Sequence, residues 1–496
     1  MMKKTKGIGM LALIVAATWG TACGPDHPSA AQVLRGAIEG APMTGPFVMT
    51  ARGTLNQAAE LQGSRPGASD QASFTETLGV TTSGAVVYEM DLDRIDGSRE
   101  WVREIHEEDA KTLYLLEDSL IIRLVDHPEL GGLERLQRRI PALLLREVAA
   151  SPDSATRLAF DADTARIEWT SPEGTPLTLV VGPGSFLQRV EYSQDLPALG
   201  PTSVTWRFDD YRSTEAGTMP HRYSSHIGAL RFLEMNVLDV SVDPSGIESL
   251  TATPEGFEGP IEVDGSESPS ARAEMEELGP GLYRIRNLRN GFHPLIVEFD
   301  EFVAVVDAPT GYPLMLEIPP GDVAPGPRPD WLSRIMRNMV ADHLSKPIQH
   351  VVLTHFHNDH AGGAPALAGP GVTVYTSPGD STGVRRMLET FGSEGAVVRA
   401  VTQGERITDG TRTLDVIQIG PNPHTHEMLV AYLHEPETLF VSDLVPGATA
   451  ADLMGEDLTP TQAFFRSWLG RTPFGSARLF TMHGTEPVDL EALTGG

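Results

Sequence analysis

The feature that most constrains this chain is a run of three histidines and one aspartate within six consecutive positions. The run directly follows an apolar segment, Ile348–Thr354, that is typical of a buried strand, and it reads His355-Phe356-His357-Asn358-Asp359-His360. Because side chains repeat with a period of two along a strand, the first two histidines point the same way, and a turn at the asparagine aims the aspartate and the last histidine at a neighbouring point. The segment therefore predicts two ligands for each of two adjacent metal ions.

The kinds of residue in this run indicate which metal it suits. Imidazole and carboxylate ligands without thiolate favour zinc, with iron or manganese as alternatives. Cys23 is the only cysteine in the chain, which excludes multi-thiolate zinc sites and intramolecular disulfides. Only 15 histidines occur among 496 residues, so a solvated polar loop is a poor explanation of three in six positions.

The run resembles the His-x-His-x-Asp-His signature of the metallo-β-lactamase superfamily. The other motifs of that family have counterparts in the same order, and the resemblance covers about residues 281–484. The counterparts are Pro423–Leu433, Thr438–Leu444 and Phe480–Gly484. The resemblance implies an α/β fold, an αββα sandwich, for the C-terminal domain.

The same resemblance implies a ligand for every position around two metal ions. The first metal would be held by His355, His357 and His424, the second by Asp359, His360 and His483, and Asp443 would bridge them. Asp307 matches the strand-end aspartate that supports the site. Pro423 stands where the family usually has glycine, and His426 is a rival to His424, which we prefer for its distance from the following strand.

Such a site implies a hydrolase that uses a metal-bound hydroxide on a small molecule containing an ester, thioester, lactone or lactam. Zinc lowers the pKa of bound water to about 7, and Asp359 would orient the hydroxide and carry its proton. Lysine is absent after Lys346, which removes one common anchor for a substrate carboxylate. Two alternatives stay open: a mononuclear iron oxidoreductase acting on sulfur substrates, and a non-catalytic metal-binding adaptor of the cell envelope. Seven ligands favour the two-metal hydrolase.

The N-terminal half is predicted to be a mainly antiparallel β domain, residues 24–250. Apolar or alternating runs separated by turns indicate strands, with helices expected at Ala31–Ile38 and Leu130–Val148 and a mixed segment from Pro25 to about Ser69. The pattern suggests a curved sheet or half-barrel, loosely similar to the periplasmic lipoprotein-carrier fold. Residues 251–279 are rich in Pro, Gly, Ser and Glu and are predicted to link this domain to residues 280–496. We expect few contacts to cross this linker, so that the C-terminal domain would fold and hydrolyse without residues 1–270.

The net charge and residues 1–23 indicate which partners the protein binds and where it is located. The formal net charge of −29 and the presence of only five lysines argue against nucleic-acid binding. Residues 1–23 combine a basic start with a short apolar run, Ile8–Ala17, which predicts an export signal. Thr21-Ala22-Cys23 resembles a bacterial lipoprotein signal, which implies a lipid anchor on Cys23 and a place in the cell envelope. A plain secretory signal, leaving a periplasmic or secreted protein, is the alternative.

Overall fold

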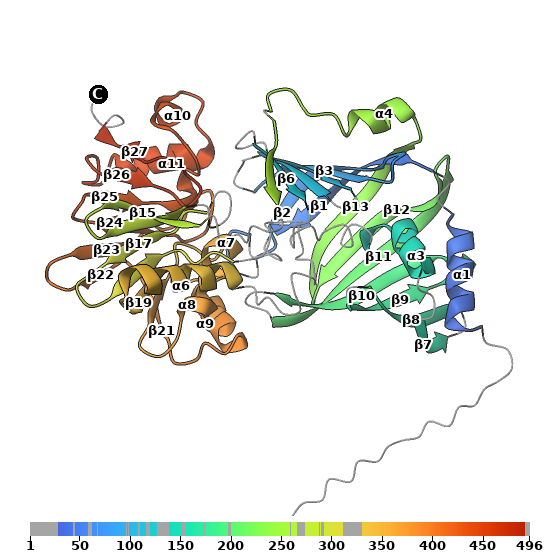
Figure 1. Ribbon diagram of the computed structural model, residues 1–496, viewed down its shortest axis with the longest axis horizontal. Helices are drawn as coiled ribbons and strands as arrows, with labels where there is room; N and C mark the ends of the chain where they lie inside the picture. Colours follow the sequence, from blue (N-terminus) through green and yellow to red (C-terminus); the bar gives the residue numbers. More distant parts are fainter. Residues whose placement is uncertain are drawn as a thin grey trace, which may run out of the picture.

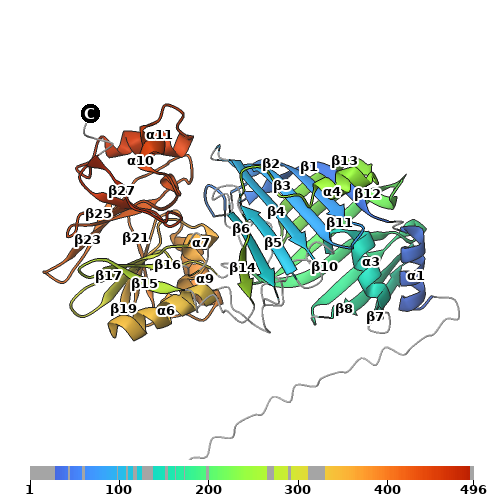
Figure 2. The ribbon, with the colours of Figure 1, turned by 45° about the horizontal axis from the view of Figure 1, so that its top comes forward.

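The computed structural model shows two domains side by side (Figures 1 and 2). It describes residues 28–42, 45–57, 62–66, 68–95, 97, 99–107, 110–115, 120–125, 138–150, 155–161, 163–172, 174–196, 200–257, 259–264, 273–286, 288, 292–310 and 330–491. The predicted export signal with Cys23, the first part of the predicted helix Leu130–Val148 and residues 311–329 lie outside the described residues.

The N-terminal domain is built on one curved, fourteen-stranded sheet (blue to green in Figure 1). Every neighbouring pair is antiparallel except β14 and β6, which are parallel. In spatial order the strands are β14 (Ile261–Asp264), β6 (Leu120–Val125), β5 (Ala110–Leu115), β4 (Arg99–His106), β3 (Val86–Asp93), β2 (Gln71–Val80), β1 (Phe47–Asn56), β13 (Leu230–Ser241), β12 (Gly217–Ile227), β11 (Gly200–Thr214), β10 (Leu187–Leu196), β9 (Pro176–Val181), β8 (Thr164–Thr170) and β7 (Ala155–Asp161).

Helices cover the end of this sheet that is farther from the C-terminal domain (Figures 1 and 2). They are α1 (Ala30–Gly40), which confirms the predicted helix Ala31–Ile38, and α3 (Pro141–Ala150). A short helix, α4 (Pro244–Ser249), follows β13, and a 3-10 turn, η4 (Pro183–Ser185), joins β9 to β10. The strand pattern predicts a mainly antiparallel sheet in this domain, and the structure confirms it.

Strand β1 was not predicted, and the description of its residues as a mixed segment is wrong. Gly53 interrupts its alternation at a position that should be apolar, which hides the strand in the sequence. A side chain at Gly53 would lie 2.3 Å from the carbonyl oxygen of Glu234 and 2.8 Å from the Phe74 ring. The glycine is therefore required where β1 passes closely between its neighbours.

The segment predicted as a linker, residues 251–279, contributes a strand to each domain. Residues 261–264 form β14 at the edge of the large sheet, and β15 (Glu274–Gly279) pairs with the first strand of the C-terminal domain. Both neighbouring domains thus extend into the segment.

The C-terminal domain contains two further sheets. The first has the order β15, β16 (Leu282–Arg286), β17 (Leu295–Glu298), β18 (Val303–Val306), β19 (Ile348–Val352), β20 (Thr373–Thr376) and β21 (Val397–Ala400). The second has the order β22 (Gly404–Thr408), β23 (Thr413–Gln418), β24 (Leu429–Leu433), β25 (Thr438–Phe440), β26 (Arg478–Phe480) and β27 (Val488–Asp489). The helical segments are α6 (Trp331–Leu344), α7 (Asn358–Ala361), α8 (Ala364–Leu367), α9 (Ser381–Thr390), η5 (Ser442–Leu444), α10 (Ala450–Met454) and α11 (Pro460–Leu469).

Three apolar clusters show how these elements pack. One holds side chains of both sheets, for example Val352 of β19 and Leu414 of β23. A second lies between the first sheet and helices α6 and α9, and a third between the second sheet and helices α10 and α11. The two sheets therefore share a buried core, and each has helices on its other face.

Within the described part of the chain, no helix combines the length and the apolar character needed to cross a membrane.

Candidate metal centre

The seven predicted ligands lie at one edge of the two sheets of the C-terminal domain. Strands β18 and β19 are parallel, with Val306 opposite Val352, and β25 and β26 are parallel, with Phe440 opposite Phe480. Parallel neighbours end at the same edge, so the segments that follow these four strands converge. They carry Asp307, the His355–His360 run, Asp443 and His483.

The predicted turn at Asn358 is the start of the short helix α7, and His357 caps its N-terminal end. Gly363 follows this helix and packs against the segment after β18: its backbone N–H donates to the carbonyl of Ala308 at 2.8 Å. A side chain at Gly363 would lie 2.2 Å from the carbonyl oxygen of Pro309. This close approach explains the glycine and fixes the helix beside the strand end that carries Asp307.

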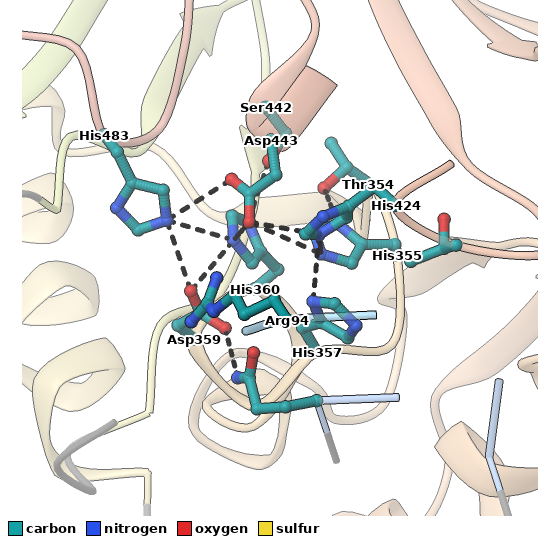
Figure 3. Close-up of polar contacts among 12 residues, drawn as sticks. Arg94, Thr354, His355, His357, Asp359, His360, His424, Ser442, Asp443 and His483 are labelled. Atoms are coloured by element: carbon teal, nitrogen blue, oxygen red, sulfur yellow. Dashed lines mark hydrogen bonds and ion pairs between the residues drawn. The ribbon is translucent and has the colours of Figure 1, made fainter. Parts of the chain in front are cut away.

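The first group of potential ligands comprises His355, His357, His424 and Asp443, all buried. His424 Nε2 lies 3.2 Å from His355 Nε2 and 3.0 Å from His357 Nδ1. Asp443 Oδ2 lies 3.3 Å from His424 Nε2 and 3.7 Å from His355 Nε2. Three imidazole nitrogens and one carboxylate oxygen thus surround a single point (Figure 3).

The second group comprises Asp359, His360, His483 and again Asp443. Asp359 Oδ2 lies 3.1 Å from His360 Nε2 and 3.2 Å from His483 Nε2, and the two imidazole nitrogens are 3.3 Å apart. Asp443 Oδ2 lies 3.1 Å from His360 Nε2. Asp443 therefore belongs to both groups and stands between them in Figure 3.

These spacings fit a metal better than a hydrogen-bonded network. Tetrahedral zinc with bonds of about 2.0–2.1 Å places neighbouring ligand atoms about 3.3 Å apart. Asp443 Oδ1 is buried and accepts no hydrogen bond from the described residues, although His483 Nε2 is 3.3 Å away. A buried carboxylate oxygen without a donor is costly, and a cation would satisfy it.

Hydrogen bonds on the far side of three histidines orient their ligating nitrogens. His360 Nδ1 donates to Asp307 Oδ2 at 2.8 Å, which leaves Nε2 with a lone pair for the centre. Thr354 Oγ1 donates to Asp307 Oδ1 at 2.8 Å, so it accepts from His355 Nδ1 at 3.1 Å, and His355 Nε2 likewise faces inward. For His357 the acceptor is the carbonyl of Gly63, 2.9 Å from Nε2, which leaves Nδ1 free to bind. Fixing the tautomer in this way is typical of metal-binding histidines.

The acid–base character of the two groups differs. Burial lowers the pKa of His355 well below its usual value and lowers that of His357 to about 3, with neighbouring histidines adding to the effect. Burial also opposes charge on His360, but the carboxylates of Asp359, Asp443 and Asp307 outweigh it and raise the pKa of His360 well above its usual value. The first group therefore offers neutral imidazoles, whereas in the second group a cation would take the place of a proton on His360.

The sequence favours His424 over His426 as a ligand, and the two histidines differ in burial. His424 is buried within the first group, whereas the side chain of His426 is exposed. The Asn422 side-chain oxygen accepts a hydrogen bond from the backbone N–H of His424 at 3.0 Å and so shapes the turn that follows.

Sequence reasoning missed the contribution of the N-terminal domain. Gln62 Nε2 donates to Asp359 Oδ1 at 2.9 Å, and the Gly63 carbonyl binds His357 as described above. Arg94, at the end of β3, is drawn with the ligand residues in Figure 3, and its guanidinium pairs with Glu100 at 2.9 Å. No local sequence signal marks Gln62 and Gly63, because each contacts a side chain far along the chain.

Comparison with known proteins agrees with this geometry. Residues 296–472 match the family model described as Metallo-beta-lactamase superfamily. The C-terminal region therefore contains a metallo-β-lactamase superfamily domain.

Among curated proteins, the chain is similar to "Lactamase-like protein nscB" of Neosartorya fischeri, 33% identical over 24% of this chain and 32% of that protein. It is also similar to two proteins named "Atrochrysone carboxyl ACP thioesterase". That of Aspergillus fumigatus is 32% identical over 24% of this chain and 25% of its own length, and that of Emericella nidulans is 25% identical over 35% and 48%. The chain thus spans about a third of the length of the first curated relatives it matches.

Among solved structures, a metallo-beta-lactamase from Pontibacter korlensis aligns with 45% of this chain and 96% of its own, at 21% identity and a TM-score of 0.33. A metallo-beta-lactamase from Hirschia baltica aligns with 45% and 94%, at 20% identity and a TM-score of 0.31.

Proposed function

We propose that this protein is a dinuclear zinc hydrolase whose C-terminal domain is an αββα sandwich. The observation that carries the proposal is the pair of four-ligand groups that share Asp443. A single tetrahedral zinc uses four ligands, so seven buried or half-buried ligand side chains support two ions.

The ligand set favours zinc, because histidine nitrogens and carboxylate oxygens surround each position, while iron and manganese also accept such ligands. In this proposal His355, His357 and His424 hold one ion, Asp359, His360 and His483 hold the other, and Asp443 joins them. Bound there, the two ions would supply Lewis acidity and an activated water at neutral pH.

The chain itself supplies proton transfer and orientation. Asp359 turns Oδ2 toward His360 and His483 and Oδ1 away from them, toward Gln62. We assign Asp359 the acid–base role: its carboxylate would orient the attacking water, accept the proton that is lost and return it to the leaving group. Asp307 keeps His360 in one orientation throughout.

We infer that the substrate is a small molecule with an ester, thioester, lactone or lactam bond. Two relatives bear thioesterase names, which supports a thioester as the substrate bond. The absence of lysine after Lys346 makes a lactam with a carboxylate to anchor less suitable.

The test is metal quantification on the purified protein together with hydrolysis assays on thioester, ester, lactone and lactam substrates. Two equivalents of zinc and turnover of a thioester or ester would support the proposal. One equivalent of iron would favour the sulfur-substrate oxidoreductase instead. Two equivalents of zinc with no turnover of any substrate, in protein shown to be folded, would favour the metal-binding adaptor.

We further propose that the protein is exported and held in the bacterial cell envelope by a lipid on Cys23. The proposal rests on the basic start, the short apolar run and the Thr21-Ala22-Cys23 sequence. Two or more acyl chains anchor a protein stably, whereas one binds only marginally.

A further inference from the structure

Three consecutive residues of the N-terminal domain each make a hydrogen bond to the metal centre or its rim. They lie in the connection between β1 and β2, and we call Gln62–Ser64 the site loop. Gln62 Nε2 donates to Asp359 Oδ1 at 2.9 Å, the Gly63 carbonyl lies 2.9 Å from His357 Nε2, and the Ser64 carbonyl accepts from the backbone N–H of His426 at 2.7 Å. Gln62 and Gly63 are both buried.

The Gly63 contact decides which nitrogen of His357 can bind a metal. A carbonyl only accepts hydrogen bonds, so His357 Nε2 carries the proton. Its lone pair then lies on Nδ1, the atom that is 3.0 Å from His424 Nε2 inside the first group. The N-terminal domain thus does for His357 what Asp307 does for His360.

The Gln62 contact acts on the second group in a similar way. Its amide N–H holds Oδ1 of Asp359, while Oδ2 faces His360 at 3.1 Å and His483 at 3.2 Å. A carboxylate held by one oxygen keeps the other in place, which reduces the orientational freedom lost when a cation binds.

The site loop is itself held in shape by the N-terminal domain. The Gln62 backbone N–H donates to the Gln57 carbonyl at 2.9 Å, and Gln57 Oε1 accepts from the Ile95 N–H at 3.0 Å. The Asp70 carboxylate accepts from the backbone N–H of Ser64 at 2.6 Å. The loop therefore presents a preformed surface to the metal centre.

We propose that the site loop is a working part of the metal centre and that the N-terminal β domain positions a ligand at each metal position. Gln62 and Gly63 are positioning residues, acting through Asp359 and His357. The proposal rests on the proposed metal sites, and it predicts that removing the Gln62 donor weakens binding of the second metal.

The test compares Gln62→Met, which keeps the side-chain length but removes the donor, with Gln71→Met as a matched control. Gln71 is an exposed glutamine at the start of β2. Loss of such a positioning hydrogen bond typically weakens metal binding by about 10–100-fold. We expect Gln62→Met to lose that much affinity for one of two zinc equivalents in a chelator-competition titration, and to change the visible spectrum of the cobalt-substituted protein. Unchanged affinities and an unchanged spectrum would overturn the proposal.

A second measurement uses the unmodified full chain and so does not depend on the folding of a variant. Because the His426 N–H donates to Ser64, its hydrogen exchange reports whether the site loop is docked. If docking and metal binding are coupled, adding zinc to the metal-free protein should slow this exchange, since the coupling is reciprocal. An exchange rate that zinc leaves unchanged, in protein that has bound two equivalents, would refute the coupling. Failure of the wild-type protein to bind zinc would instead refute the proposed function.

Discussion

Asp307→Asn should selectively weaken the second metal site, because Asp307 determines which nitrogen of His360 is protonated. The carboxylate is completely buried. Its Oδ1 accepts from the backbone N–H of Thr354 at 2.9 Å and from Thr354 Oγ1 at 2.8 Å, and its Oδ2 accepts from His360 Nδ1 at 2.8 Å and Ser442 Oγ at 3.1 Å. One carboxylate thus satisfies four donors.

An asparagine of the same shape can satisfy only part of this arrangement. Its oxygen must face Thr354, which presents two donors, so its NH₂ group faces His360. His360 Nδ1 would then have to accept, and the proton would move to Nε2, the atom that points to the second metal position. Ligation by His360 would require this proton to leave and the amide contact to break.

The expected loss is about 10–100-fold in affinity, or about 1.4–2.7 kcal/mol, for one of two zinc equivalents. Competition with a zinc chelator at pH 7 measures both equivalents. Ser442→Ala is the control. It removes the hydroxyl that lies 3.1 Å from Asp307 Oδ2 and 2.9 Å from His360 Nδ1, but the Asp307 carboxylate still accepts from His360 Nδ1, so the tautomer stays the same and both sites should be retained to within a few-fold. If Asp307→Asn binds two zinc ions as tightly as the wild type, then the tautomer argument is wrong.

Three further predictions follow from the same structure. Replacing His483 and Asp443 together by alanine should leave at most one metal per chain; two equivalents in elemental analysis would contradict the ligand assignment. Burial and the nearby charge of Glu427 raise the pKa of Asp380 to about 7, so the folded protein keeps this proton where the unfolded chain loses it, and the contribution of Asp380 to stability falls as pH rises toward 7. Asp380→Asn should therefore raise the melting temperature at pH 8 more than at pH 5, and an equal change at both would refute this reasoning. Cys23→Ser should release the protein from membranes, whereas an unmodified mature N-terminus downstream of Cys23 in mass spectrometry would exclude the lipid anchor.

The sequence predicts those site residues that directly follow the end of a strand. Buried parallel strands leave short apolar runs, and residues that follow them reach the same edge of a sheet whatever their separation along the chain. The His355–His360 run and Asp443 are of this kind, and the structure brings them together. The strand predicted at Ile348–Thr354 is confirmed as β19 (Ile348–Val352), which has parallel neighbours on both sides.

The parts that could not be predicted depend on contacts without a local pattern. Gln62 and Asp359 are 297 positions apart, and His357 and Gly63 are 294 apart. Gln62 follows a strand that the sequence does not reveal, so no periodic pattern marks it. The Gly63 contact is made by a backbone carbonyl, which every residue has. The sequence does not reveal β1, because Gly53 breaks the alternation of apolar residues along this strand. Glycine stands there because the neighbouring strands leave no room for a side chain.

These contacts make the metal centre of the C-terminal domain depend on the N-terminal domain. The C-terminal domain has its own buried cores, and its folding without residues 1–270 stays a prediction. Its metal ligands are less independent, because His357 Nε2 and Asp359 Oδ1 find their partners in the site loop. Without the loop, both atoms would lose the partners that orient them. If the loop strengthens metal binding, the metals must strengthen docking of the loop by the same factor, since the coupling between two binding events is reciprocal. Metal binding would then hold the N-terminal domain against the metal centre. The connection between the domains would not have to do so, since residues 251–279 are predicted to be a linker.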